Sequence, residues 1–207
     1  MIQKNLKTKT MMVDLDDTMV SFSEMFVNRA NSIISYGKFP AIVDERLKIE
    51  DFQSYEIIDL FKKFDNYQYL DIEYLCDSIC SEIFSDVNFY NNPIFTLELS
   101  AIKKLIARYK NEYKIILNTK VSSLEMVISK TKLFKEYALF DWFDEIIIDY
   151  EKGGHTPKNT NYDIMVDDAL HNIEYYLEQN KEGIVFMPLR PWNEQIKNHP
   201  RVNILKK

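Results

Sequence analysis

The sequence is poor in the residues that mark secreted scaffolds and membrane proteins. It has only two cysteines, Cys76 and Cys80, four residues apart. So few cysteines exclude a disulfide framework, and we expect ordinary reduced thiols. No window approaches the roughly 20 apolar residues that a transmembrane helix needs. The first residues are rich in Lys and Thr and do not resemble an apolar signal segment. We therefore expect a cytoplasmic protein that does not bind membranes.

Other scarcities narrow the classes of binding site. The three histidines, His155, His171 and His199, are too scattered to predict a histidine metal site. The formal net charge is −6, which argues against binding to a long nucleic acid, because such binding needs a basic surface. A small anionic substrate needs only a few local cations and stays compatible with this charge.

The rest of the composition is that of a globular protein. The 207 residues allow one domain, or one domain that carries a sizeable insertion. Hydrophobic residues make up 46% of the chain, which is enough for a core, and 28% of the residues are charged.

Three apolar segments each run into acidic or hydroxyl residues at their carboxyl ends. They are 9–13 with Asp14 and Asp16, 113–118 with Thr119, and 163–166 with Asp167 and Asp168. The carboxyl ends of parallel strands meet at one edge of a sheet, where open α/β sheets bind ligands. The pattern therefore predicts one site made from all three segments.

Hydrophobic periodicity and breaker residues predict the order of elements. The expected elements are strand 9–13, helices at about 22–34, 49–64 and 69–84, helix 96–109, strand 113–119, helix 122–137, strand 144–148, loop 150–161, strand 163–166, helix 170–179, strand 183–187, and a terminal unit of 191–197 and 201–205. This alternation predicts an α/β fold with a Rossmann-like, three-layer parallel sheet core. We expect the core in 1–20 and 92–207. We expect a small α-helical cap, inserted after the first strand, in 21–91. The cap would cover the acids as a lid, unless it is a helical bulge remote from the site.

Acids at two strand ends provide a ligand set for a hard cation, and Mg²⁺ prefers such oxygen ligands together with a phosphate. A positioned carboxylate can attack phosphorus, and the second acid of an Asp-x-Asp pair can exchange protons with the leaving oxygen and with water. A hydroxyl and a lysine would stabilise the phosphoryl oxygens. Thr119 offers the hydroxyl, while several lysines could supply the cation.

These motifs resemble those of the haloacid dehalogenase (HAD) superfamily of phosphohydrolases. The segment from Asp14 to Thr18 is similar to the first motif, Thr119 to the second, and Asp167 with Asp168 to the fourth. A narrower resemblance is to the 5'(3')-deoxyribonucleotidase family. It rests on 13–22, on 163–168 followed by His171 and Asn172, and on 183–186 followed by 191–193.

The narrower resemblance implies a magnesium-dependent hydrolase, a nucleotidase that forms an aspartyl-phosphate. It implies Asp14 as nucleophile and Asp16 as general acid/base. It implies that Asp167 binds the metal together with Asp14 and the Asp16 backbone carbonyl, and that Asp168 orients the metal shell. Thr119 is implied as a phosphate contact, and Thr18 and Phe22 as substrate contacts. Lys130 best matches the third-motif lysine, and Lys132 is the alternative. Lys152 and Lys158 are candidates for a second phosphate contact.

The sequence departs from that family at Asp17, where a glycine is usual, and at Ala169, where a basic residue is common. These departures leave phosphatase chemistry in place and weaken the indication that the substrate is a nucleotide. We expect a small phosphorylated partner such as a nucleoside monophosphate, and a homodimer stays open. The alternatives are a phosphatase for another small metabolite or a nucleic-acid end, and a non-catalytic metal- or partner-binding module.

Overall fold

The computed structural model describes residues 9–39, 42, 44–67, 70–150 and 161–206. Six parallel strands form one sheet in the order β3-β2-β1-β4-β5-β6. The strands are β1 (Lys9–Val13), β2 (Tyr113–Val121), β3 (Glu145–Tyr150), β4 (Ile164–Val166), β5 (Ile184–Pro188) and β6 (Val202–Leu205). The sheet is flanked by helices, so the predicted Rossmann-like α/β fold is confirmed.

The apolar runs form central strands because both faces of the sheet are covered by helices. Met11 and Val13 of β1 belong to the core cluster that includes residues of α4 (Leu99–Tyr109) and α5 (Leu124–Glu136). Met12 points to the other cluster, which includes residues of α6 (Leu170–Gln179). The alternation along β1 therefore fixes the two faces, and the next residue, Asp14, emerges at the strand end.

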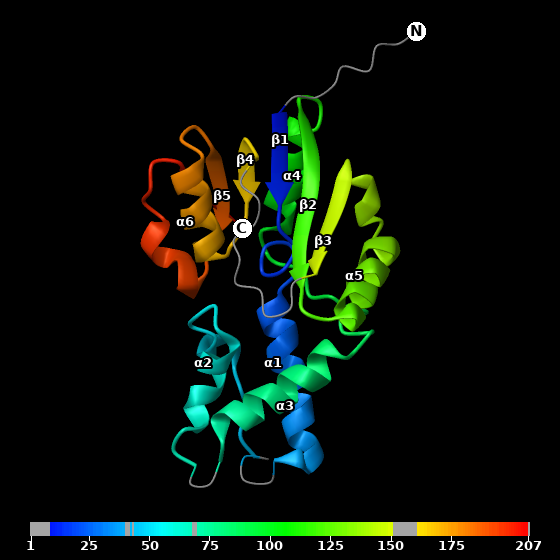
Figure 1. Ribbon diagram of the computed structural model, residues 1–207, viewed down its shortest axis with the longest axis vertical. Helices are drawn as coiled ribbons and strands as arrows, with labels where there is room; N and C mark the ends of the chain where they lie inside the picture. The colour runs from blue at the N-terminus through cyan, green and yellow to red at the C-terminus, as the bar shows by residue number, and fades with distance from the viewer. Residues whose placement is uncertain (1–8, 40–41, 43, 68–69, 151–160, 207) are drawn as a thin grey trace.

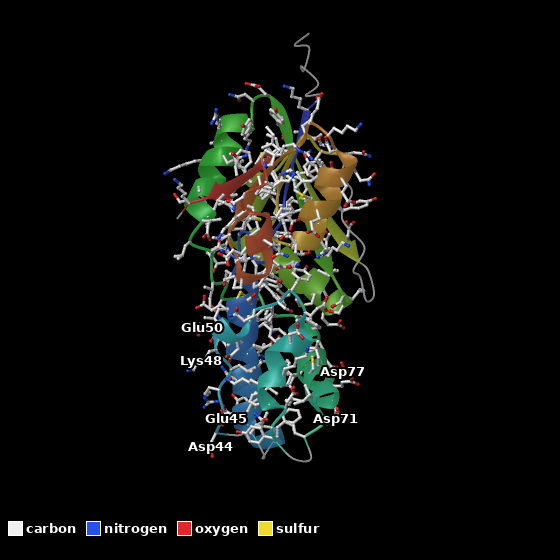
Figure 2. All side chains as sticks on the ribbon, turned by 90° about the vertical axis from the view of Figure 1, so that its left-hand side faces the viewer. Asp44, Glu45, Lys48, Glu50, Asp71 and Asp77 are labelled. Atoms are coloured by element: carbon white, nitrogen blue, oxygen red, sulfur yellow. The ribbon has the colours of Figure 1, made fainter. Side chains whose placement is uncertain are left out.

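A second group of helices lies at the carboxyl edge of the sheet, toward which the strand arrows point (Figure 1). We call α1 (Phe22–Ile33), α2 (Ile57–Phe61) and α3 (Ile72–Phe84), with the short helical turns between them, the helical unit. Figure 2 shows that charged side chains such as Asp44, Glu45 and Asp71 project from the part of this unit that lies away from the sheet. The cap boundaries at 21 and 91 stay a prediction.

The two connections between the helical unit and the sheet run side by side. Val20 and Phe95 form an antiparallel bridge. The Ser21 amide donates to the Ile94 carbonyl at 2.7 Å, and the Thr96 amide donates to the Met19 carbonyl at 3.0 Å. The chain therefore leaves the sheet after β1 and returns to it at nearly the same place.

The prediction of one continuous helix at 49–64 is wrong. The structure has a 3₁₀ turn at Ile49–Asp51, the short helix α2, and another 3₁₀ turn at Lys62–Phe64. Between them, the Ser54 hydroxyl donates to the Asp59 carboxylate at 2.6 Å and accepts from the Glu56 amide at 3.0 Å. Such side-chain bonds compete with helical backbone bonds, so the helix is interrupted at Ser54.

Among the described residues, we find no helix that combines the length and apolar character needed to span a membrane.

Candidate active site

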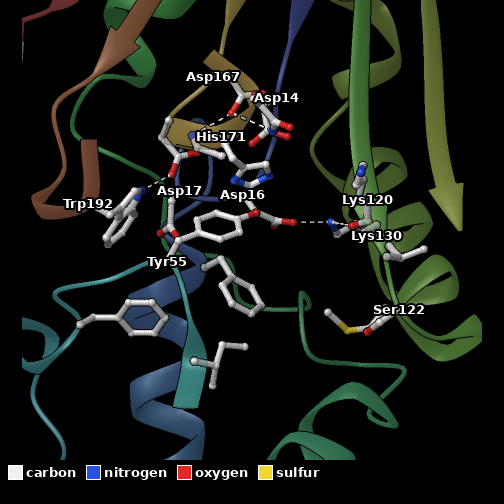
Figure 3. Close-up of a pocket in the computed structure, with 18 of the residues that line it drawn as sticks. Asp14, Asp16, Asp17, Tyr55, Lys120, Ser122, Lys130, Asp167, His171 and Trp192 are labelled. Carbon is white, nitrogen blue, oxygen red and sulfur yellow. Dashed lines mark hydrogen bonds and ion pairs between the residues drawn. The ribbon is translucent and has the colours of Figure 1, made fainter. Parts of the chain in front are cut away.

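The ends of β1 and β4 bring three buried carboxylates together. The Asp14 amide donates to the Val166 carbonyl at 2.8 Å, which sets Asp14 beside Asp167 and Asp168. One carboxylate oxygen from each of the three acids lies within 4.8 Å of the other two. Figure 3 shows Asp14 and Asp167 side by side at the top of a pocket. The strand ends thus converge as the sequence pattern predicts.

The protein holds two of these carboxylates in place with neutral donors. Asp167 accepts from the Ala169 amide at 2.9 Å and from the Asn172 side chain at 3.2 Å. Asp168 accepts from the Thr18 hydroxyl and from the Trp192 indole N–H, both at 3.0 Å. Thr18 is fully buried and does not line the pocket. The Thr18 hydroxyl therefore orients Asp168, and the role of Thr18 as a substrate contact stays a prediction.

The charge of this cluster fits a divalent cation. Burial, and then the negative charges of Asp17, Asp14 and Asp167, raise the pKa of Asp168 well above its usual value. Several buried acids so close together repel one another unless a cation compensates them. Three carboxylates converging on one point match the oxygen preference of Mg²⁺, which keeps part of its coordination for water and phosphate. The residues present therefore suit this ion.

A second group of polar residues faces the triad across the pocket. The Lys130 ammonium forms an ion pair with the Asp16 carboxylate, drawn as a dashed line in Figure 3. It also donates to the Thr119 hydroxyl at 2.6 Å and to the Lys120 carbonyl at 2.8 Å. Only 1% of Lys130 is exposed. The structure thus brings Asp16, Thr119 and Lys130 together.

The Asp16 side chain points to Lys130 and lies outside the group of three acids that could hold a metal. Asp14, Asp167 and Asp168 are thus the carboxylates that could hold a metal, and the metal roles of Asp16, including that of its backbone carbonyl, stay predictions. The alternative lysine, Lys132, is exposed and donates to the Asn88 side chain at 2.8 Å. Lys132 is therefore outside the site.

Sequence analysis missed Tyr90. Its hydroxyl donates to the Asp16 oxygen that Lys130 does not contact. Burial and the negative charge of Asp16 raise the pKa of the Tyr90 phenol well above its usual value. Tyr90 lies between the helical unit and α4, in a segment without any recognisable motif, so no sequence signal pointed to it.

A pocket of about 330 Å³ joins the acids to the helical unit (Figure 3). Its polar wall contains Asp14, Asp16, Lys120, Lys130 and Asp167. Its apolar and aromatic wall consists of Phe22, Phe52, Tyr55, Ile57, Phe84, Val121, Met126 and Trp192. Phe22 is half-buried and lies at the start of α1. Both the sheet and the helical unit therefore contribute to the lining of the pocket, and the role of the helical unit as a lid stays a prediction.

Two aromatic contacts at this pocket link the segment before α2 to α6 and to the 3₁₀ turn Pro191–Ile196. The rings of Tyr55 and His171 lie 4.8 Å apart, and those of Phe52 and Trp192 lie 5.8 Å apart. Although 47% of Tyr55 is exposed, its hydroxyl end lies in the pocket. Burial of that end, followed by the negative charges of Asp168 and Asp14, raises the pKa of its phenol well above the usual value. The segment that interrupts the expected helix thus supplies part of the pocket wall.

Asp17 occupies a left-handed backbone conformation, with φ of 51°. Glycine adopts this conformation most easily, and aspartate tolerates it. The Asp17 carboxylate accepts from the Ser23 amide at 2.9 Å and from its hydroxyl at 2.6 Å. It thereby caps the first turn of α1, where the side chain of the N-cap residue Ser21 makes no capping hydrogen bond. Arg190 donates to the Asp17 carbonyl at 2.7 Å. These contacts explain how an aspartate is held in this backbone conformation.

Two predicted site residues, Lys152 and Lys158, lie outside the described residues, as does most of the expected loop 150–161. Their roles stay predictions.

Comparison with known proteins identifies the fold. No protein-family model and no curated protein matches the sequence. Solved structures do match. A candidate phosphoglycolate phosphatase from Lactobacillus delbrueckii subsp. bulgaricus is 10% identical, covers 98% of this chain and 95% of its own, and has a TM-score of 0.58. A HAD-superfamily hydrolase of subfamily IA from Geobacter sulfurreducens is 12% identical, with coverage of 88% and 89% and a TM-score of 0.53.

A haloacid dehalogenase-like hydrolase from Xanthomonas campestris is similar to the same degree, with 15% identity, coverage of 94% and 89%, and a TM-score of 0.51. The chain has the fold of these HAD-superfamily hydrolases, with a buried aspartate cluster at the carboxyl edge of its sheet. These structures do not support the narrower resemblance to deoxyribonucleotidases.

Proposed function

We propose that this protein is a magnesium-dependent phosphomonoesterase that works through an aspartyl-phosphate on Asp14. The observation that carries the proposal is one pocket with a buried triad of acids on one side and the Lys130–Asp16 pair on the other. A cation site beside an ionised lysine suits a phosphate dianion, and the adjacent acid can supply or accept a proton.

The chain's own residues divide the reaction into two displacements. Asp16 enters the first step in its protonated form. A carboxylate oxygen of Asp14 attacks phosphorus, and the bond from phosphorus to the ester oxygen breaks as Asp16 gives that oxygen its proton. Asp16, now a carboxylate, takes a proton from water, which attacks the same phosphorus and breaks its bond to Asp14. Inorganic phosphate leaves, Asp14 is again a carboxylate, and Asp16 again carries the proton.

The remaining residues position and neutralise charge. Bound by Asp14, Asp167 and Asp168, Mg²⁺ would offset the negative charge of the acids and of the phosphate group. Lys130 holds the phosphoryl oxygens, with the Thr119 hydroxyl directly beside its ammonium group. Asn172, Thr18 and Trp192 keep the acids oriented.

We further propose nucleoside monophosphates, including deoxynucleotides, as the substrate class. The pocket volume of about 330 Å³ is at the lower end of the usual range for small-molecule sites. Phe22, Phe52 and Tyr55 give it an aromatic wall opposite the acids, and such side chains can stack on a base. A phosphatase for another small metabolite would use the same acids and a different part of this wall.

Release of phosphate from a panel of nucleoside monophosphates and sugar phosphates, with and without Mg²⁺, tests the proposal. We expect metal-dependent release that Asp14→Asn abolishes while the fold stays intact. The matched control is Asp77→Asn, which changes an exposed acid on α3. Activity that survives Asp14→Asn would contradict the assignment of Asp14 as the nucleophile. Release from sugar phosphates alone would contradict the substrate class and leave the chemistry standing.

A further inference from the structure

The Asp16 carboxylate is held at both of its oxygens. Lys130 contacts Oδ2 from α5, and the Tyr90 hydroxyl contacts Oδ1 from the segment that follows the helical unit. A phenol keeps its proton at neutral pH, so Tyr90 is the donor and Asp16 the acceptor. The two contacts come from opposite sides of one carboxylate.

Tyr90 is itself anchored to the helix that carries Lys130. Its backbone amide donates to the Ser129 hydroxyl at 2.9 Å, and Ser129 directly precedes Lys130. The Lys130 ammonium lies 5.5 Å from the centre of the Tyr90 ring. Tyr90 is fully buried and does not line the pocket. Tyr90, Lys130 and Asp16 therefore form one closed set of contacts, in which Asp16 and Lys130 line the pocket and Tyr90 lies behind them.

We propose that Tyr90 is a positioning residue that fixes the carboxylate plane of Asp16 for proton transfer. This inference rests on the proposed function, in which Asp16 is the general acid/base. Rotation about the last side-chain bond of an aspartate is broad and two-fold, so one contact from Lys130 leaves the plane free to turn. The second contact, from Tyr90, removes that freedom.

A series of phosphate monoesters whose leaving groups differ in pKa tests this role. A poor leaving group, such as an alkyl alcohol, depends on protonation by Asp16, whereas 4-nitrophenolate departs with little help. General acid–base catalysis typically contributes about 10²–10⁴-fold. We therefore expect Tyr90→Phe to lower kcat/KM about tenfold for the alkyl ester, since the acid is retained but misplaced. For 4-nitrophenyl phosphate we expect less than about a twofold loss of kcat/KM. The comparison uses kcat/KM because it reports the first displacement, whereas kcat also contains the second displacement, in which Asp16 is the base for every ester.

The matched control is Tyr67→Phe. Tyr67 also donates its hydroxyl to a carboxylate, that of Glu45, but this pair is exposed and lies in the helical unit away from the pocket. We expect this variant to match the wild type on both esters. Asp16→Asn is the reference for loss of the acid and should show the same dependence on the leaving group, with a larger loss. Tyr90→Phe added to Asp16→Asn should cost nothing further.

Equal losses of kcat/KM on both esters would assign Tyr90 a structural role only and overturn the proposal, as would an unchanged kcat/KM. If Asp16→Asn shows no dependence on the leaving group, the acid/base role of Asp16 fails and the role of Tyr90 fails with it. If Tyr90→Phe does not fold, Ser129→Ala is the second variant. Ser129→Ala removes the anchor of the Tyr90 amide and keeps the Tyr90 hydroxyl. A smaller loss of kcat/KM with the same dependence on the leaving group supports the proposal, and an equal loss on both esters overturns it.

Discussion

The ammonium group of Lys130 lies against the carboxylate of Asp16, although 114 residues separate them in the sequence. A charged group that is almost fully buried needs a partner that compensates for its lost hydration. Lys130 has three such partners, because the Thr119 hydroxyl and the Lys120 carbonyl accept from it as well. The fold thus keeps one cation at the carboxyl edge of the sheet, opposite the acids.

The first prediction concerns this cation. We expect Lys130→Met to lower kcat for phosphate release about 10²-fold or more, because removal of one preorganised donor to a developing charge typically costs that much. Steady-state kinetics measures the loss, and thermal unfolding reports how far the fold is affected. Lys132→Met, on the exposed face of the same helix, is the control. Similar kinetics for the two variants would count against a role for Lys130.

The second prediction concerns the metal. We expect Asp167→Asn to raise the Kd for Mg²⁺ at least about tenfold, because it removes one charged ligand from the triad. Titration calorimetry measures the affinity directly. Mg²⁺ should also raise the melting temperature of the wild-type protein, and above the Kd this rise should continue with the logarithm of the Mg²⁺ concentration. Asp77→Asn should bind Mg²⁺ as the wild type does. An Asp167→Asn variant with unchanged affinity would place the ion elsewhere.

The third prediction concerns pH and Asp17. Burial raises the pKa of Asp17 from 3.8 to about 6, so the folded protein holds this proton more tightly than the unfolded chain. The stabilising contribution is therefore complete below about pH 3.8, and it is lost as the pH rises through 6. For the metal-free protein this loss amounts to about 3 kcal/mol of the free energy of unfolding.

Asp17→Asn removes the titrating group, while asparagine tolerates the left-handed backbone and can still accept from the Ser23 amide. Urea unfolding in the presence of a chelator, at intervals between pH 4 and 7, measures the difference. We expect the variant to lose less stability than the wild type across this range. Parallel curves for the two proteins would show that Asp17 does not titrate as the structure indicates.

Much of the fold follows from the sequence because its strands are short, apolar and bounded by polar residues. Strand 9–13 is observed with the predicted bounds. The interruption at Ser54 could not be predicted, because 49–64 contains no glycine or proline and the spacing of Ile57, Phe61 and Phe64 fits a helix. The helix is broken by side-chain bonds of Ser54 that depend on local geometry.

The choice between Lys130 and Lys132 did have a sequence signal. Met126, Ser129, Leu133 and Phe134 form the buried face of α5, and Lys130 lies at the matching helical position. A lysine where the pattern calls for an apolar residue indicates a buried charge with a partner. Tyr90 had no comparable signal, because its contact with Asp16 depends on how the chain returns from the helical unit.

The bridge between Val20 and Phe95 sets where the chain departs from the sheet and where it rejoins it. Because these two points are neighbours, the helical unit is an insertion whose two ends lie at the same place on the sheet. Such an insertion can be shortened, enlarged or exchanged without moving Asp14, whose position is fixed by β1 and β4. Under the proposed function, the helices that line the pocket can therefore vary while the residues that break the phosphate ester bond stay in place.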